Sequence, residues 1–157
     1  MQRIVVLGRG GAGKSTLAER LERTTALPRT ELDAVFWSAE LEPTPCDDWR
    51  RTQADLATRE RWILDGDLGP HDDLAPRLRR ADTVIVLDLP AWRCAWRVIR
   101  RGRETRDFWS WMLRWRRRDR PMILRAIDRH APTATLVVLS SPAEIDRWIE
   151  QVSAAGD

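Results

Sequence analysis

One stretch of the sequence has residue types and spacing suited to binding the phosphates of a nucleotide. The pattern G-x-x-x-x-G-K-[ST] of a phosphate-binding loop is met by Gly8, Arg9, Gly10, Gly11, Ala12, Gly13, Lys14, Ser15 and Thr16. Glycines let the backbone curl so that successive N–H groups point at one phosphate. Lys14 is expected to reach the β- and γ-phosphates of ATP, and the Ser15 hydroxyl to ligate Mg²⁺. The sequence therefore predicts that ATP and Mg²⁺ bind at this loop.

Lys14 is the only lysine among the 27 basic residues of the chain, and the other 26 are arginines. Composition alone would therefore put an arginine at this position. A compact ammonium fits a phosphate cradle, whereas a planar guanidinium is a poor substitute. The lysine favours a phosphate-binding role over a simple glycine turn before an ordinary helix.

The elements on either side of the loop are those that its chemistry needs. Residues 3–7 form a short apolar run rich in β-branched side chains, which predicts a buried strand. Residues 16–23 place Leu17, Ala18 and Leu21 on one face of a predicted helix. The amino terminus of that helix adds a partial positive charge beside the bound phosphates.

The rest of the chain alternates between predicted strands and helices. We predict further strands at 28–32, 62–65, 83–87 and 135–139, and helices at about 46–59, 72–80, 90–101, 105–118, 121–130 and 142–152. Such alternation predicts one α/β domain over residues 1–157, with a parallel sheet covered by helices on both faces. Ligands bind such sheets beyond the carboxyl ends of the strands, so polar residues just after the strands are candidate site residues.

Asp65 is the first of these candidates, because it closes a hydrophobic predicted strand. A carboxylate there can hold a Mg²⁺-bound water beside Ser15. The alternative is a helix-capping or loop aspartate. Asp88 also ends a hydrophobic strand, and it ranks below Asp65 as a metal residue.

The bulk composition narrows the class of protein. The chain has 157 residues and no apolar run long enough to cross a membrane. Met1 leads directly into the first predicted strand, so no signal peptide is expected. The only cysteines, Cys46 and Cys94, have no metal-binding spacing and form no disulfide framework. We therefore expect a cytoplasmic protein without a membrane partner.

The positive charge is concentrated in one part of the chain. Residues 93–129 hold 13 arginines against four acidic residues, although the whole chain has a net charge of only +3. Such asymmetry indicates an anionic ligand over that region. Most single arginines there are nevertheless expected to be solvated or paired with acids.

Taken together, these motifs resemble those of small P-loop kinases of the adenylate kinase superfamily. More narrowly, the chain resembles the adenylate-kinase-like DNA topology modulation proteins. The residues that carry the resemblance are 8–16, 32–33, 36–37, 62–66, 81–90, 97–103, 118–121 and 141–146. The resemblance implies a P-loop NTPase fold, a three-layer α/β/α sandwich with a five-stranded parallel sheet in the order 2-3-1-4-5.

The resemblance also implies roles for particular residues. It supports Asp65 as a magnesium residue and places the ATP base near Ser141 and Pro142. It also implies that Asp88 caps the helix that begins near Pro90. Arg97 and Arg101, four residues apart on one helix face, match the lid-flanking arginines of adenylate kinases and would neutralise the transferred phosphoryl group.

The acceptor of the phosphoryl group is expected beyond the second strand, where Asp33 lies. An acceptor hydroxyl needs a carboxylate to orient it or to take its proton, whereas an acceptor phosphate does not. The alternative for Asp33 is a solvated turn residue. Trp37, in an irregular stretch after Asp33, and Asp67 are the other candidate substrate residues.

The chain departs from the narrower family in two places. Asp67-Leu68 stands where that family usually has Asn-Tyr, and only residues 102–107 separate two helices that a longer insert usually separates. We therefore expect a short arginine-rich lid region near residues 97–120.

Two functions remain open at this point. The first is an ATP- and Mg²⁺-dependent kinase for a small acceptor, most simply a nucleoside or nucleotide. The alternative is a regulatory nucleotide-binding ATPase whose basic surface contacts nucleic acid or a protein partner. Tryptophans interleaved with arginines could stack bases, but Trp62, Trp111, Trp115 and Trp148 fall on apolar faces that indicate core. Nucleic acid is therefore not the favoured partner, and the sequence leaves the oligomeric state open.

Overall fold

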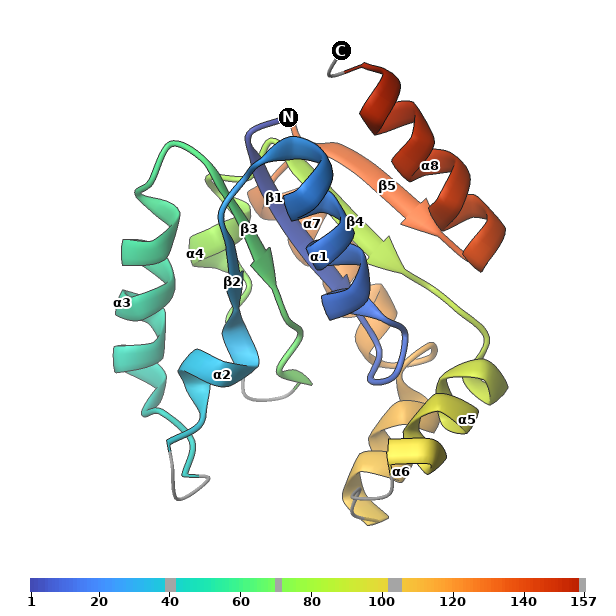
Figure 1. Ribbon diagram of the computed structural model, residues 1–157. Helices are drawn as coiled ribbons and strands as arrows, with labels where there is room; N and C mark the ends of the chain where they lie inside the picture. The colour runs from blue at the N-terminus through green and yellow to red at the C-terminus, as the bar shows by residue number, and fades with distance from the viewer. Residues whose placement is uncertain (39–41, 70–71, 102–105, 156–157) are drawn as a thin grey trace.

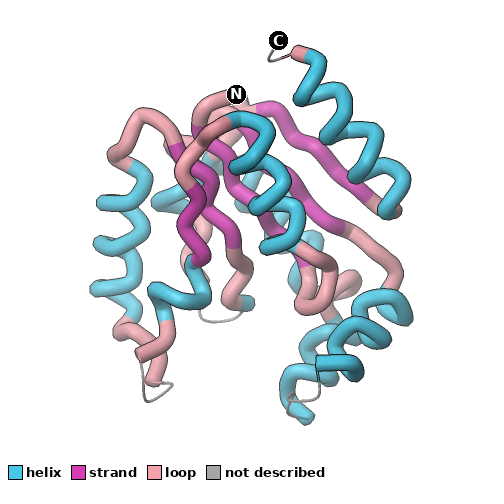
Figure 2. Tube along the Cα trace, in the orientation of Figure 1, coloured by secondary structure: helices cyan, strands magenta, loops and turns pink. Residues whose placement is uncertain are grey.

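Five parallel strands form the centre of the computed structural model, which describes residues 1–38, 42–69, 72–101 and 106–155. The strands are β1 (Arg3–Gly8), β2 (Arg29–Glu31), β3 (Trp62–Asp65), β4 (Thr83–Leu87) and β5 (Thr135–Leu139). Their order in the sheet is β2-β3-β1-β4-β5, and every pair is parallel. Figure 2 shows the strands in magenta, side by side. The predicted fold class and strand order are confirmed.

The helices cover both faces of the sheet and its carboxyl end. They are α1 (Lys14–Thr25), α2 (Leu32–Phe36), α3 (Cys46–Ala57), α4 (Ala75–Leu78), α5 (Ala91–Arg101), α6 (Arg106–Arg114), α7 (Asp119–His130) and α8 (Pro142–Ala154). Helices α1 and α8 pack on one face, and α3, α4 and α7 pack on the other (Figure 1). Helices α5 and α6 lie beyond the carboxyl ends of the strands, on the same side as the loop between β1 and α1.

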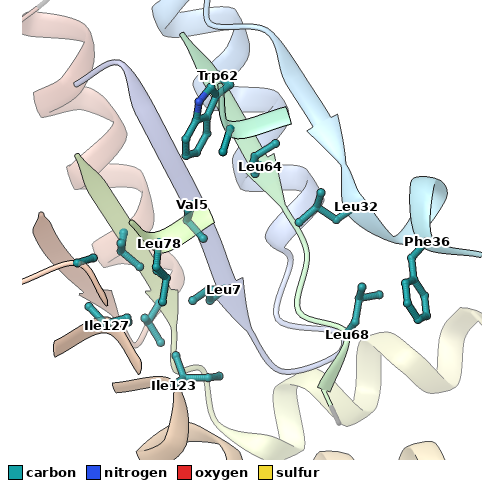
Figure 3. Close-up of a cluster of buried hydrophobic side chains, with 14 of the residues drawn as sticks. Val5, Leu7, Leu32, Phe36, Trp62, Leu64, Leu68, Leu78, Ile123 and Ile127 are labelled. Carbon is teal, nitrogen blue, oxygen red and sulfur yellow. The ribbon is translucent and has the colours of Figure 1, made fainter. Parts of the chain in front are cut away.

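The alternation of side chains along β1 explains these two layers. Val5 and Leu7 join the core on the side of α3, α4 and α7, part of which Figure 3 shows. Ile4 and Val6 join the core on the side of α1 and α8. Because successive strand residues point to opposite faces, a strand buried on both faces must be apolar throughout.

The structure differs from the predicted elements mainly at their ends. The short helix α2 was not predicted, and it places Asp33 in a first helical turn directly after β2. Helix α3 begins directly after Pro45, and no side chain caps its amino terminus. The predicted helix at 105–118 ends at Arg114, and α7 begins at Asp119 rather than at Pro121. The reason is a turn in which the Trp115 carbonyl accepts the N–H groups of both Asp119 and Arg120.

A buried arginine fixes the loop that follows β3. Arg77 is completely buried, and its guanidinium donates to both carboxylate oxygens of Asp72, at 2.9 and 2.6 Å. It also donates to the Gly66 carbonyl at 3.1 Å and to the side-chain oxygen of Gln53. Asp72 in turn accepts the backbone N–H of Leu68. Gly66, Leu68 and Asp72 are therefore joined to Arg77 by one ion-paired network.

We expect Arg77→Ala to lower the free energy of unfolding by about 3–5 kcal/mol, because it leaves the Asp72 carboxylate buried without its cation. Urea denaturation measures the change. Arg79→Ala, an exposed arginine just beyond α4, is the matched control. A loss no larger than that of the control would show that Arg77 does not hold this loop.

The same network predicts a pH dependence. Burial by itself raises the pKa of Asp72, but the charge and hydrogen bonds of Arg77, with those of Leu68 and Trp49, outweigh burial and lower that pKa. A carboxyl whose pKa is lower in the folded state than in the unfolded state stabilises the protein at pH values above its unfolded-state pKa. This stabilisation is lost as the pH falls through the lowered, folded-state pKa. The difference in free energy of unfolding between wild type and Arg77→Ala should therefore become smaller as the pH is lowered.

Candidate functional site

The loop between β1 and α1 carries the only lysine of the chain. Lys14 Nζ donates to the carbonyl oxygens of Gly8 at 2.9 Å and Arg9 at 3.4 Å, so the ammonium bends back across the loop. Gly11 and Gly13 have φ values of +75° and +93°, which L side chains rarely adopt. Gly13 directly precedes α1, so the first N–H groups of that helix open onto the loop. This is the geometry of an anion cradle at a helix amino terminus.

The glycines are also required by close packing against neighbouring elements. A Cβ atom on Gly11 would lie 2.7 Å from the Cys94 carbonyl oxygen and 2.7 Å from a methyl group of Val98, both in α5. A Cβ atom on Gly13 would lie 2.8 Å from Arg97 Nη1. The loop is therefore held between β1 and α5, and no side chain projects from it at Gly11 or Gly13. Its peptide groups can approach a phosphate closely, which fits the predicted binding of ATP.

Asp65, at the end of β3, has a carboxylate oxygen that suits a magnesium ion or its bound water. The side chain is buried, and its Oδ2 accepts a hydrogen bond from Arg29 Nη1 at 3.4 Å. Its Oδ1 is buried and has no hydrogen-bond partner among the described residues. Burial raises the pKa of Asp65, and the Lys14 charge, the nearby Ser15 hydroxyl and Arg29 oppose that rise. An orphaned oxygen near a hydroxyl is a donor set that Mg²⁺ accepts.

Asp33 and Asp67 bring two more carboxylates to the same end of the sheet. Asp33 follows β2, and its Oδ2 lies 3.5 Å from where a Cβ atom on Gly66 would stand. Asp67 is only 8% exposed, and its Oδ1 accepts the N–H of Gly69 at 3.1 Å.

Desolvation raises the pKa of both Asp33 and Asp67, and the charge of Lys14 opposes the rise in each. Lys14 acts in the same way on Asp65. The structure thus gathers three of the predicted site carboxylates, from the ends of two strands, within electrostatic reach of Lys14.

Arg97 lies on the other side of the loop. Its Nη1 donates to the Ala12 carbonyl at 3.2 Å, which joins α5 to the phosphate-binding loop. Beside it is a pocket of about 540 Å³ between the loop, α5 and the start of α8. Its lining includes Thr16, Trp96, Arg97, Arg100, Pro142 and Ile145. The Arg100 guanidinium lies 4.8 Å from the centre of the Trp96 ring, so the pocket offers the flat faces on which a nucleotide base stacks.

The remaining predicted residues are placed as follows. Pro142 lines this pocket, whereas the Ser141 hydroxyl accepts the N–H of Glu144 at 3.3 Å and caps α8. Trp37 follows α2, and its backbone N–H donates to the Asp33 carbonyl at 3.3 Å. The Trp37 ring packs edge-on against Phe36. The side chain of Arg101 lies outside the described residues.

Two arginine contacts at this site were not foreseen from the sequence. The Arg9 guanidinium is buried 5.0 Å from the centre of the Trp115 ring, and burial lowers its pKa. Asp88, expected to cap the helix near Pro90, instead accepts hydrogen bonds from Arg116 at 3.1 Å and Arg120 at 2.9 Å. The Arg9 contact joins the phosphate-binding loop to Trp115, just after α6. The Asp88 contacts join the end of β4 to the segment between α6 and the first turn of α7.

Comparison with known proteins gives a fold and no family. No protein-family model and no curated protein sequence matches the chain. A solved structure of shikimate kinase from Acinetobacter baumannii, in complex with shikimate, matches with a TM-score of 0.67 at 15% identity, covering 97% of this chain and 90% of that one. A sugar kinase from Janibacter sp. HTCC2649 matches with a TM-score of 0.55 at 23% identity, covering 99% and 91% of the two chains.

A gluconokinase from Sinorhizobium meliloti 1021 also matches, with a TM-score of 0.55 at 20% identity, covering 99% of this chain and 98% of that one. The similarity extends over nearly the whole length of every partner. The chain therefore has the α/β fold of small P-loop kinases, as its strand order also indicates.

We expect Trp96→Ala to weaken the binding of a non-hydrolysable ATP analogue. Loss of one aromatic face under a base costs about 1–3 kcal/mol, which corresponds to a rise in Kd of roughly five- to 150-fold. Isothermal titration calorimetry measures the affinity. Trp92→Ala is the matched control, because Trp92 is an exposed tryptophan one turn earlier on α5 and is absent from the residues that line the pocket. Equal affinities for the two variants would place the base elsewhere.

Proposed function

We propose that the chain is an ATP- and Mg²⁺-dependent kinase that transfers the γ-phosphoryl group to a hydroxyl of a small molecule. The observation that carries the proposal is the position of Lys14. Its ammonium rests on the glycine loop and acts on Asp33, Asp65 and Asp67 at once. A phosphate-binding cation beside carboxylates from two other strand ends is suited to holding a donor and an acceptor together.

On the donor side, the backbone N–H groups of residues 8–16 would hold the phosphates, and Lys14 would neutralise the β- and γ-phosphates. Ser15 and Asp65 would hold Mg²⁺ directly or through water. When bound, the metal ion supplies positive charge to the phosphate oxygens. Pro142, with Ser141 beside it, would lie at the nucleotide base.

On the acceptor side, Asp33 would orient the hydroxyl and take its proton. Asp67 and Trp37 would form part of the acceptor site. Arg97, which already contacts the loop, would stabilise the charge that spreads over the transferred group. By resemblance, Arg101 would assist it.

Several finer assignments belong to this proposal. The chain would be one domain over residues 1–157 with a short arginine-rich lid near 97–120, and membership of the DNA topology modulation family stays a prediction from sequence. A nucleoside or nucleotide is the acceptor that the resemblance suggests. No helix in the described ranges is long and apolar enough to cross a membrane. We propose a cytoplasmic location.

One observation favours the second function, a nucleic-acid-binding regulatory ATPase. Trp92 and Trp96 are 68% and 59% exposed on α5, and arginine guanidinium groups lie over both rings. Stacked arginine and tryptophan can bind single-stranded nucleic acid. Such binding would weaken steeply with salt, whereas a kinase would turn over ATP faster when its acceptor is added.

We expect Asp33→Asn to bind Mg²⁺ and an ATP analogue normally, because Ser15 and Asp65 remain. Acceptor-stimulated turnover should fall by roughly 10²–10⁴-fold if the carboxylate removes the hydroxyl proton. A coupled ADP assay measures turnover, and Asp55→Asn, an exposed acid on α3, is the control. Weakened Mg²⁺–nucleotide binding with no effect on the acceptor would instead place Asp33 at the metal.

Arg97→Ala should lower kcat more than it weakens ATP binding, because charge on the transferred group is greatest in the transition state. Arg93→Ala, four residues earlier on the same helix and absent from the lining of the pocket beside Trp96, should leave kcat unchanged. The comparison uses steady-state kinetics together with calorimetric affinities. If Arg97→Ala keeps full turnover, another arginine stabilises the transition state.

A further inference from the structure

Arg29, the first residue of β2, is the only cation among the described residues that forms an ion pair with the Asp65 carboxylate. Its Nη1 donates to Asp65 Oδ2 at 3.4 Å. Asp65 is only 1% exposed, so separation of the pair would leave a buried charge without its partner. Because that state is strongly unfavourable, the contact resists separation. Arg29 is therefore placed to fix the orientation of the Asp65 carboxylate.

The guanidinium of Arg29 is itself held by three other acids. Its Nε lies 3.8 Å from Glu22 and its Nη2 lies 3.8 Å from Glu19, both in α1. Its Nη1 lies 3.7 Å from Glu31 in β2. The three glutamate side chains are 44–52% exposed, so each pair alone contributes little. Together they lie beside all three nitrogens of the guanidinium and restrict the directions in which it can turn.

The register of the sheet places Asp65 next to the phosphate-binding loop. Asp65 lies opposite Val6 of β1, and the following Gly66 donates its N–H to the Val6 carbonyl at 3.3 Å. Strand β1 ends at Gly8, the first residue of the loop. Burial raises the pKa of Asp65, and the nearby Ser15 hydroxyl is among the groups that oppose the rise. Asp65 therefore lies between the end of β2 and the start of α1.

The two oxygens of the Asp65 carboxylate have different surroundings. Oδ2 accepts the hydrogen bond from Arg29, whereas Oδ1 is buried and has no hydrogen-bond partner among the described residues. A carboxylate that ligates a metal is commonly hydrogen-bonded in this way by a second group, whose removal typically costs about 10- to 100-fold in metal affinity. One anchored oxygen and one unpartnered oxygen are what a ligating carboxylate needs.

We propose that Arg29 is a positioning residue of the magnesium site, which holds Asp65 Oδ2 so that Oδ1 is presented to the metal ion or to its bound water. The inference rests on the proposed function for the metal at Ser15 and Asp65. Arg29 acts through Asp65 and does not itself bind the metal or the nucleotide. If Arg29 only neutralised the carboxylate, its removal would strengthen the binding of a cation. Positioning and neutralisation therefore predict opposite changes in metal affinity.

Arg29→Gln separates the two roles. The affinity of the full chain for a non-hydrolysable ATP analogue is measured by calorimetry, once with Mn²⁺ in excess and once in EDTA. Mn²⁺ is the probe because it takes the same oxygen ligands as Mg²⁺. The variant should bind the Mn²⁺-loaded analogue about tenfold more weakly than wild type and the metal-free analogue equally well. Arg61→Gln, an exposed arginine just before β3, is the matched control and should change neither affinity.

Three results would overturn the proposal. They are an unchanged affinity of Arg29→Gln for the Mn²⁺-loaded analogue, a tighter affinity for it, and an equal loss with and without the metal. The last result would show that Arg29 supports the fold of the site without acting on the metal.

Asp65→Asn tests whether Arg29 acts through Asp65. The single variant should weaken the Mn²⁺-loaded analogue, and adding Arg29→Gln to it should cause no further loss. A further loss in the double variant contradicts the positioning role. If Asp65→Asn weakens binding and Arg29→Gln does not, only the positioning role is wrong. If Asp65→Asn binds the Mn²⁺-loaded analogue as wild type does, the proposed metal site is wrong as well.

Arg29→Lys takes the place of Arg29→Gln should that variant fail to fold by circular dichroism. Lysine keeps a positive charge for the buried Asp65, but one ammonium group cannot reproduce the contacts of a planar guanidinium. It should weaken the Mn²⁺-loaded analogue by at least about threefold, without changing the affinity in EDTA. A folded lysine variant with the affinity of wild type would rule out positioning by Arg29.

Discussion

The contact of the Lys14 ammonium with the carbonyl groups of its own loop is the interaction on which the site depends. It holds a positive charge at the carboxyl end of β1, in the middle of the sheet order. The elements around it are arranged by that position. Helix α5 packs so closely on the loop that only glycine fits at Gly11. The charge of Lys14 then acts on the carboxylates of Asp33, just after β2, and Asp65, at the end of β3.

Charge near this cation is balanced in two different ways. Some charges are neutralised by ion pairs, as Arg77 with Asp72 and Arg120 with Asp88 show. Asp65 and Asp67, on which the charge of Lys14 acts, each keep a buried oxygen without a hydrogen-bond partner among the described residues. Unsatisfied buried groups lower stability, and they are expected where ligands bind.

The sequence predicted the parts of the molecule that local pattern determines. Apolar runs located the five strands, and the spacing of Gly8, Gly13 and Lys14 located the loop. The order of the strands followed from the resemblance of the whole chain. Contacts between distant residues were beyond reach, because no local signal marks Arg77 as buried or joins Arg9 to Trp115, 106 positions away in the numbering.

The central claim is that Lys14 and its loop bind the phosphates of ATP. Calorimetric titration of Lys14→Ala with a Mg²⁺-bound, non-hydrolysable ATP analogue tests it most directly, with Arg23→Ala at the far end of α1 as the control. A charged hydrogen bond contributes about 1.5–3 kcal/mol, so the account predicts that Lys14→Ala weakens affinity by at least about tenfold while Arg23→Ala binds as wild type. A folded Lys14→Ala variant with wild-type affinity would contradict the account.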